Sequence, residues 1–238
     1  MPHPAGRRPV VGVSLKMYFS LADARRWLLE AAEVVPDSVE FFAAPSYLAI
    51  PDALEAFPDG TAAQDVAAEE SGAFTGEVSA AELAEAGVRY VEVGHAERRR
   101  LFGETDEVVA AKAAAALRHG LVPVLCVGEM TEGPAAEVVV AQLRSALAGA
   151  PAGRVIVAYE PVWAIGADAP ASDDHIRRVC AALRDARREP HDAVIYGGSA
   201  GPGLLTRLGD AVDGIFLGRF AHDPAALRAV VDEAVARG

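Results

Sequence analysis

Eight apolar runs rich in β-branched residues, each followed by an alanine-rich stretch of helical periodicity, follow one another along the whole chain. The runs do not alternate apolar with polar residues, which is typical of strands in a parallel sheet covered by helices. Eight such units close a barrel, so we expect a single-domain (β/α)8 barrel of the α/β class over residues 1–238. Strands are expected near 9–14, 39–44, 61–66, 88–94, 121–128, 154–161, 193–199 and 213–218, and helices near 20–34, 46–57, 79–86, 104–119, 135–149, 172–188, 203–208 and from about 224.

An open doubly wound sheet is the alternative architecture. Its nucleotide-binding members carry a G-x-G-x-x-G sequence after the first strand or a P-loop, and this chain has neither. A length of 238 residues suits one barrel domain, and 52% hydrophobic residues supply its core. No linker or low-complexity tract divides the chain, and we expect residues 1–8 to form a flexible lead-in.

Several classes of protein are disfavoured by simple features of the sequence. No apolar run is long enough to span a bilayer, and the opening "MPHPAGRRP" has no apolar segment behind its arginines, so we expect neither membrane insertion nor secretion. The two cysteines, Cys126 and Cys180, lie inside apolar segments and form no C-x-x-C pair, which suits a reducing cytoplasm. We expect no metal site and no cofactor.

The charge balance is acidic, with 22 basic against 34 acidic residues and a net charge of −12. This balance argues against nucleic acid or a membrane surface as a partner. An anionic substrate would need a local positive site in this negative field. Lysine occurs only at Lys16 and Lys112, whereas every other basic residue is arginine, so Lys16 is a candidate for a compact point charge; the alternative is a surface lysine without function.

Active sites of such barrels lie where the strands end, so the residues at these ends are the candidates. They are Ser14, Lys16, Gln64, Asp65, His95, Glu97, Glu160, Gly197, Gly198, Ser199, Gly218 and Arg219. A carboxylate can abstract a proton beside a carbonyl, an imidazole can polarise that carbonyl, and glycine turns can aim backbone N–H groups at a phosphate. Together these groups favour proton transfer between adjacent carbons of a phosphorylated substrate.

Each of these residues also has a purely structural interpretation. Glu160 could form an ion pair with an arginine at the barrel rim, His95 could cap a helix, and "YGGS" alone is only a turn. The convergence of all of them on one face favours the functional interpretation.

Seven motifs occur in a recognisable order: "LKMY", "GAFTGEVS" at 72–79, "VEVGHAERR" at 91–99, "FGETDE", "CVGE", "AYEPVWAIG" and "YGGS". This series resembles the triosephosphate isomerase family along essentially the whole chain, and "AYEPVWAIG" together with "GHAERR" is highly specific. The resemblance implies an aldose–ketose isomerase that needs no cofactor and works through an enediol or enediolate.

The resemblance also implies a role for each matching residue. Glu160 would shuttle the proton and His95 would be the neutral electrophile, roles for which triosephosphate isomerase is itself the standard example. Lys16 would anchor the substrate electrostatically with Glu97 beside it. Backbone amides of Gly166 and Ser199 would bind the phosphate, and the strand that ends at Gly218 would supply the second phosphate loop. The segment after "AIG" would close over the site as a lid.

The loop "GAFTGEVS" resembles the one that reaches into a neighbouring subunit in this family. Thr75 at its tip would then touch the partner's active site, so we expect a two-fold homodimer.

The chain departs from the family pattern at several positions. Ser14 and Leu15 stand where the family has asparagine and tryptophan, and Tyr18 and Ala96 replace an asparagine and a serine. The lid reads "ADAPAS" over 167–172, with Asp168 near its tip and Pro170 in its second hinge, and Arg219 replaces a glycine of the phosphate loop. These changes resemble a branch of the family whose members isomerise four-carbon sugar phosphates.

We therefore expect an isomerase of a short phosphorylated sugar, either an erythrulose phosphate or the pair glyceraldehyde 3-phosphate and dihydroxyacetone phosphate. Ser14 leaves room beside Lys16, and the Arg219 guanidinium can grip a displaced phosphate, so a four-carbon substrate is favoured. The alternative is a non-catalytic sugar-phosphate-binding or regulatory barrel, for which Ser14, Ala96 and Arg219 are the best arguments.

Overall fold

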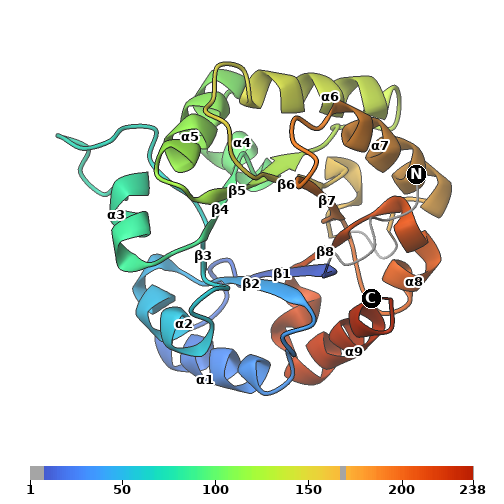
Figure 1. The fold of residues 1–238 in the computed structure, drawn as a ribbon, viewed down its shortest axis with the longest axis horizontal. Coiled ribbons are helices and arrows are strands. Elements are labelled where there is room, and N and C mark those ends of the chain that lie inside the picture. Colours follow the sequence, from blue (N-terminus) through green and yellow to red (C-terminus); the bar gives the residue numbers. More distant parts are fainter. Residues whose placement is uncertain (1–7, 167–169, 238) are drawn as a thin grey trace.

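Eight parallel strands form one sheet in the computed structural model, which describes residues 8–166 and 170–237. The strand order is β2-β1-β8-β7-β6-β5-β4-β3, and a parallel bridge between Ala43 and Thr61 joins the two outer strands. Ala43 N donates to Gly60 O at 2.9 Å beside this bridge, so the sheet closes into a barrel with the helices outside it (Figure 1). The expected (β/α)8 fold is confirmed.

The strands are β1 (Val10–Ser14), β2 (Glu40–Ala44), β3 (Ala62–Ala63), β4 (Tyr90–Val93), β5 (Val122–Val127), β6 (Ile156–Tyr159), β7 (Ala193–Tyr196) and β8 (Gly214–Leu217). The α-helices are α1 (Leu21–Ala32), α2 (Ile50–Ala56), α3 (Ala80–Ala86), α4 (Ala96–Phe102), α5 (Asp106–Arg118), α6 (Ala135–Ala146), α7 (Asp173–Ala186), α8 (Leu204–Leu208) and α9 (Pro224–Val235). Short 3₁₀ turns occur at Tyr47–Ala49, Val162–Ala164, Gly209–Ala211 and Arg219–His222.

All eight strands lie where the sequence predicts them, but the helical part of the fourth unit differs from the expectation. Instead of one helix near 104–119, a short helix α4 precedes α5. Gly103 ends α4 with a φ of +70°, a left-handed conformation that favours glycine, and the Thr105 side chain then caps α5 by accepting from Val108 N. The sequence analysis missed α4 because it is too short to show helical periodicity.

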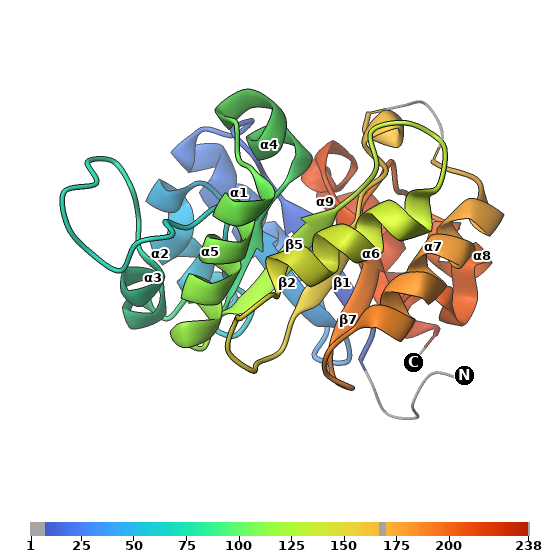
Figure 2. The ribbon, with the colours of Figure 1, turned by 90° about the horizontal axis from the view of Figure 1, so that it is seen from above.

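Two apolar layers hold the barrel together. Alternate strand residues point inward and fill its lumen, among them Phe42, Tyr90, Ile156, Ile195 and Phe216. The residues between them point outward and pack under the helices, and each fully buried leucine, isoleucine or phenylalanine side chain contributes about 1.5–3 kcal/mol. The side view in Figure 2 shows the helices as a layer around the strands.

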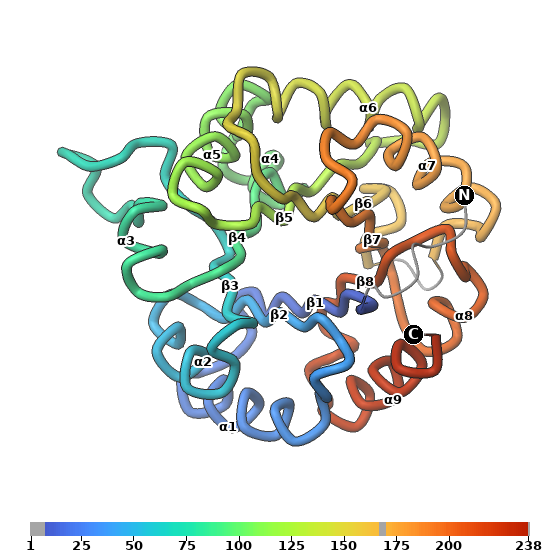
Figure 3. Tube along the Cα trace, viewed as in Figure 1, coloured from blue at the N-terminus to red at the C-terminus, as the bar shows by residue number. Residues whose placement is uncertain are grey.

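The first and last units of the chain are neighbours in the ring (Figure 3). The buried indole of Trp27 in α1 donates from Nε1 to Ala221 O at 2.8 Å, in the segment that follows β8. This bond fixes the rim of the barrel next to the residues at the ends of β1 and β8.

The connection from β3 to α3 projects away from the barrel in both views (Figures 1 and 2). Residues 69–77, which include Thr75, are all exposed. Both cysteines are buried and unpaired. Across 8–166 and 170–237, no helix has the length and apolar character needed to cross a membrane.

Candidate active site

A cavity of about 1280 Å³ opens at the carboxyl ends of the strands. It brings together every predicted site residue except the loop residue Thr75: Ser14, Lys16, His95, Glu97, Glu160, Gly166, Ser199, Gly218 and Arg219 all line it. Of the other expected strand-end residues, Gly197 and Gly198 belong to the lining, whereas Gln64 and Asp65 do not. Residues from six strands and their loops therefore meet in one chamber.

Glu160 lies directly after β6 and stays attached to the sheet, because Glu160 N donates to Val127 O at 2.8 Å. Its side chain is buried, and its Oε2 has no hydrogen-bond partner in the part of the chain that the structure describes. A Cβ atom at Gly197 would lie 2.8 Å from Glu160 Cγ, so only glycine leaves room for this carboxyl. Burial is the largest cause that raises the pKa of Glu160 to about 8.

His95 begins α4 and faces Glu160 across the cavity, with 3.5 Å between His95 Nε2 and Glu160 Oε2. Its Nδ1 accepts from Glu97 N at 3.1 Å, so in the neutral ring the proton sits on Nε2. Burial, and then the charge of Lys16, lower the pKa of His95 to about 4. At neutral pH the imidazole is uncharged, and its protonated Nε2 lies on the side of the ring that faces Glu160.

His95 is also a helix cap, as its structural interpretation proposed, because its side chain caps α4. Capping and function are compatible here, because the hydrogen bond that caps α4 uses Nδ1 and leaves Nε2 for the cavity. The alternative interpretation of Glu160, an ion pair with a rim arginine, has no such contact among the described residues.

Lys16 follows β1 in a conformation that few non-glycine residues adopt, with a φ of +48°. Gln64 stabilises this backbone, because its Nε2 donates to Lys16 O at 3.0 Å and to Ala44 O at 2.9 Å. The Lys16 ammonium lies 2.6 Å from Glu97 Oε1, so the expected pairing of these two residues is confirmed. A strained backbone of this kind costs about 1–3 kcal/mol and is typical of functional sites.

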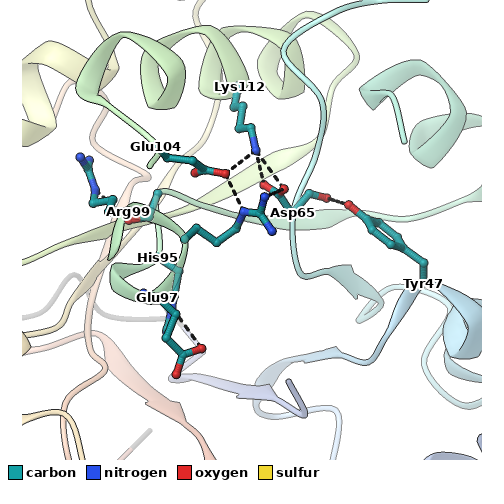
Figure 4. Close-up of polar contacts among 9 residues, drawn as sticks. Tyr47, Asp65, His95, Glu97, Arg99, Glu104 and Lys112 are labelled. Carbon is teal, nitrogen blue, oxygen red and sulfur yellow. Dashed lines mark hydrogen bonds and ion pairs between the residues drawn. The ribbon is translucent and has the colours of Figure 1, made fainter. Parts of the chain in front are cut away.

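The second lysine, Lys112, has a structural role. Its Nζ donates to both carboxylate oxygens of Asp65, at 2.7 and 2.9 Å, and to Glu104 Oε1 at 2.6 Å (Figure 4). Arg98 of α4 contacts the same two acids, with Arg98 Nε 2.5 Å from Glu104 Oε1 and Arg98 Nη2 2.9 Å from Asp65 Oδ2. The expectation that Asp65 faces the site is wrong, because these two cations draw its carboxylate into a cluster that fixes α4, and with it His95.

The phosphate-binding candidates lie in the loops after β6, β7 and β8. Gly166 is the last described residue before the gap at 167–169, and its φ of +73° explains the need for glycine. Ser199 Oγ donates to Ala164 O at 3.0 Å, which joins the β7 loop to the base of the β6 loop. Asp168 lies outside the described residues, whereas Pro170 lines the cavity.

Arg219 follows Gly218 at the end of β8 and is exposed at the cavity wall. Its guanidinium carbon lies 5.9 Å from the ring centroid of Tyr18, and no carboxylate among the described residues forms an ion pair with it. Tyr18 packs edge-on against His222, with 5.3 Å between ring centroids. Two departures from the family pattern, at 18 and 219, are thus neighbours in space, which the sequence analysis did not predict.

The base of the β6 loop contains a polar network that sequence reasoning missed. Glu129 Oε1 accepts from Tyr159 Oη at 3.0 Å and from Trp163 Nε1 at 2.8 Å, and His175 Nε2 lies 3.2 Å from it. The sequence feature that could have indicated this network is Glu129, the acid of the "CVGE" motif. This network ties both ends of the β6–α7 connection to the end of β5.

Glu92, in the middle of β4, is the second residue that the sequence analysis passed over. It is buried, and burial raises the pKa of its carboxyl to about 8. The sequence feature that could have drawn attention to Glu92 is that it is a lone acid at an inward position of an apolar strand. No group of three or more histidine, cysteine, aspartate or glutamate side chains in the described ranges is arranged to hold a metal ion.

Comparison with known proteins gives a consistent picture. The family profile described as triosephosphate isomerase matches residues 9–234. The chain is 47% identical to an L-erythrulose-1-phosphate isomerase of Pectobacterium atrosepticum, with 97% of each chain covered. It is 39% identical to a triosephosphate isomerase of Symbiobacterium thermophilum, covering 97% of this chain and 100% of the relative, and 40% identical to one of Citrifermentans bemidjiense, covering 94% and 98%.

Proposed function

Because the chain belongs to the triosephosphate isomerase family, we propose that it is an isomerase that moves a proton between adjacent carbons of a short phosphorylated sugar. The observation that carries this proposal is the pair formed by Glu160 and His95, which face each other across 3.5 Å in a cavity large enough for such a sugar. The same pair of a glutamate base and a neutral histidine is established in triosephosphate isomerase itself.

In the proposed reaction, the Glu160 carboxylate removes a proton from the carbon beside the substrate carbonyl. The Nε2–H of neutral His95 donates a hydrogen bond to the carbonyl oxygen, and the Lys16 ammonium stabilises the negative charge that develops on the enediolate. The Glu160 carboxyl then returns the proton to the neighbouring carbon, so the carbonyl moves by one position. A pKa of about 8 makes the Glu160 carboxylate a stronger base than an ordinary glutamate, and the fraction of the protein that carries this carboxylate should increase as pH rises toward 8.

The phosphate would bind at the loops after β6, β7 and β8. Backbone N–H groups of Gly166 and Ser199 and the turn at Gly218 supply donors, and Arg219 supplies a local positive charge in a protein of net charge −12. Its position over Tyr18, with no carboxylate partner among the described residues, leaves the guanidinium available for an anion.

We favour a four-carbon substrate, an erythrulose phosphate, over glyceraldehyde 3-phosphate. In erythrulose 1-phosphate, the carbon that loses its proton carries a hydroxymethyl group in place of a hydrogen. The Pectobacterium relative, at 47% identity, is named for that substrate, whereas the two triosephosphate isomerases stand at 39% and 40%. Ser14 lines the cavity next to Lys16 and is shorter than the family's asparagine, which leaves space for that group.

The test is a coupled assay of L-erythrulose 1-phosphate, dihydroxyacetone phosphate and glyceraldehyde 3-phosphate on one preparation, with kcat/KM as the measure. We expect the four-carbon substrate to be preferred. A preference of tenfold or more for a three-carbon substrate, about 1.4 kcal/mol in activation free energy, would make the protein an ordinary triosephosphate isomerase.

The non-catalytic alternative has no support. The relatives are named as isomerases, and Glu160, His95 and Lys16 keep a geometry that a binding site alone does not require. If the protein turned over none of the three substrates, the non-catalytic alternative would have to be considered again.

We further propose a cytoplasmic homodimer. The two buried, unpaired cysteines are compatible with a reducing compartment. The exposed loop at 69–77, with Thr75 in it, extends beyond the barrel as an arm that a partner subunit would order.

A further inference from the structure

Glu92 is a carboxyl in an otherwise apolar part of the barrel lumen. It lies in β4, in register with Val124 of β5, two residues after the inward-facing Tyr90. Only 3% of Glu92 is exposed. A buried polar group is costly unless hydrogen bonds compensate it, so its presence needs a reason.

The Ser14 hydroxyl is the candidate hydrogen-bond partner of the Glu92 carboxyl. It lies close enough to lower the pKa of Glu92, yet neither Ser14 Oγ nor Glu92 Oε1 completes a hydrogen bond with any described residue. Strands β2 and β3 separate β1 from β4, and their residues in this lumen cluster are Phe42, Ala44 and Ala62, of which Ala44 is in register with Ser14. The two alanine side chains are small, which leaves space for the Glu92 carboxyl to reach toward Ser14.

The two residues differ in their access to the cavity. Ser14 belongs to its lining, whereas Glu92 lies beneath it. Glu92 therefore does not line the cavity itself, and Ser14 is the lining residue through which it can position a substrate. The charged and titratable groups around Glu92 come from every neighbouring element: Lys16 after β1, Asp65 after β3, Glu97 on α4, Cys126 on β5 and Glu160 after β6.

Burial raises the pKa of Glu92 to about 8, and three of the surrounding groups are acids, so at neutral pH the carboxyl keeps its proton. A protonated carboxyl has one O–H donor and acceptor capacity besides. It can therefore donate to the Ser14 hydroxyl and leave the hydroxyl proton free to point into the cavity.

We propose that Glu92 is a positioning residue that orients the Ser14 hydroxyl to bind the terminal hydroxyl of a four-carbon sugar phosphate. The inference rests on the proposed isomerase function and concerns its substrate choice. A site built to bind a substrate hydroxyl discriminates strongly against an analogue without it, because its own polar groups are then left unpaired. Dihydroxyacetone phosphate lacks that terminal hydroxymethyl group and is the natural comparison.

The test compares Glu92→Leu, which removes the polar group, with Glu92→Gln, which keeps a neutral donor and acceptor of the same length. For Glu92→Leu we expect kcat/KM to fall at least tenfold with L-erythrulose 1-phosphate and less than threefold with dihydroxyacetone phosphate. The Gln variant keeps the ratio of the two within about threefold of the unaltered protein. Equal losses on both substrates, or an unchanged ratio in the Leu variant, would overturn the proposal.

Two further readouts separate positioning from a general structural effect. If Glu92 acts through Ser14, the double variant Ser14→Ala, Glu92→Leu should lose no more activity on the four-carbon substrate than the worse single variant. Additive losses would contradict the proposal.

The second readout is the pH profile. In the unaltered protein, kcat/KM for the four-carbon substrate should decline above about pH 8 as Glu92 ionises, and Glu92→Gln should abolish this decline. An unaltered protein that turns over neither substrate would overturn the proposed function together with this inference, whereas an active protein with an unchanged ratio overturns the inference alone.

Discussion

At the position of Glu160, burial has two consequences for one carboxyl. It removes water that would otherwise solvate the charge, which raises the pKa to about 8 and makes the carboxylate a stronger base. It also leaves Oε2 without a hydrogen-bond partner in the described chain, so in the proposed mechanism the substrate would complete its contacts. Gly197 is part of the same arrangement, because any side chain there would collide with the carboxyl.

We predict that Glu160→Gln lowers kcat by roughly 10² to 10⁴ or more, the usual contribution of general acid–base catalysis, because an amide cannot accept the substrate proton. The affinity for the sugar phosphate should stay within a few-fold, since the phosphate contacts lie elsewhere. Steady-state kinetics and substrate titration of the variant measure both quantities. The control is Glu137→Gln on the exposed face of α6, which should change neither; weakened binding with normal turnover at 160 would assign Glu160 a structural role.

The placement of the candidate site residues was predictable where unusual residues stand at strand ends. Glu160, His95 and Lys16 follow apolar runs, and the structure brings them to one cavity. The tautomer of His95 and the raised pKa of Glu160 were not predictable, because both depend on distances and burial that exist only after folding. Glu92 was missed because an acid inside an apolar strand does not disturb the strand pattern.

At the scale of elements, the functional groups depend on how short segments are held. His95 is placed by α4, a helix of one or two turns that the sequence pattern did not show. The cluster of Arg98, Asp65, Glu104 and Lys112 ties α4 to α5 and to the end of β3 (Figure 4). Breaking a buried pair of this kind costs about 3–5 kcal/mol, because the remaining charge stays buried without compensation. The strand pattern predicted the order of elements but not this cluster, since it joins a residue after β3 to residues of the following unit.

The β8 loop gives a prediction about phosphate binding. Hydrogen bonds to charged groups contribute about 1.5–3 kcal/mol, so Arg219→Gln should raise KM by a factor of about 10 or more, with a smaller effect on kcat. Kinetics at two salt concentrations provide the measurement, because loss of the charge also reduces the salt dependence of KM. The matched control is Arg228→Gln, exposed on α9, which removes the same charge elsewhere. Equal effects of the two variants would mean that Arg219 acts only through the overall field.

At the scale of the whole molecule, two buried carboxyls couple stability to pH. Glu92 and Glu160 have native pKa values of about 8, well above the value of about 4.3 expected in the unfolded chain. Between these values the native state binds more protons than the unfolded state. The stability contributed by the two protonated carboxyls is therefore complete below about pH 4 and is lost as pH rises toward 8, by up to about 1.4 kcal/mol per pH unit for each group.

Replacement of either carboxyl by its neutral amide removes this dependence. We predict that Glu160→Gln raises the thermal unfolding midpoint relative to the unaltered protein, and that the gain at pH 8 exceeds the gain at pH 5. All other titrating groups are the same in the two proteins, so the difference isolates residue 160. Thermal unfolding followed by circular dichroism at both pH values is the measurement; an equal gain at the two pH values would show that the native pKa of Glu160 is not raised.

The assembly is the last property that belongs to the whole molecule. The segments after the first four strands each carry a large apolar side chain that is exposed: Met17, Leu48, Phe74 and Phe102. In a barrel, these segments lie along one half of the rim, and exposed apolar surface gathered in this way marks a protein interface. Phe74 and Thr75 lie in the arm at 69–77, which projects away from the barrel (Figure 2).

We predict that the protein is a two-fold homodimer at micromolar concentration and that Phe74→Asp converts it to a monomer, because the new charge would be buried against the partner. The monomer should also lose most of its kcat, since Thr75 would no longer reach the partner's active site. Light scattering coupled to size exclusion, with the isomerase assay on the same fractions, tests both statements. Val138→Asp on the exposed surface of α6, on another side of the barrel in Figure 1, serves as the control and should leave a fully active dimer. An unaltered protein that is monomeric and fully active would contradict the prediction, because the arm would then need no partner to order it.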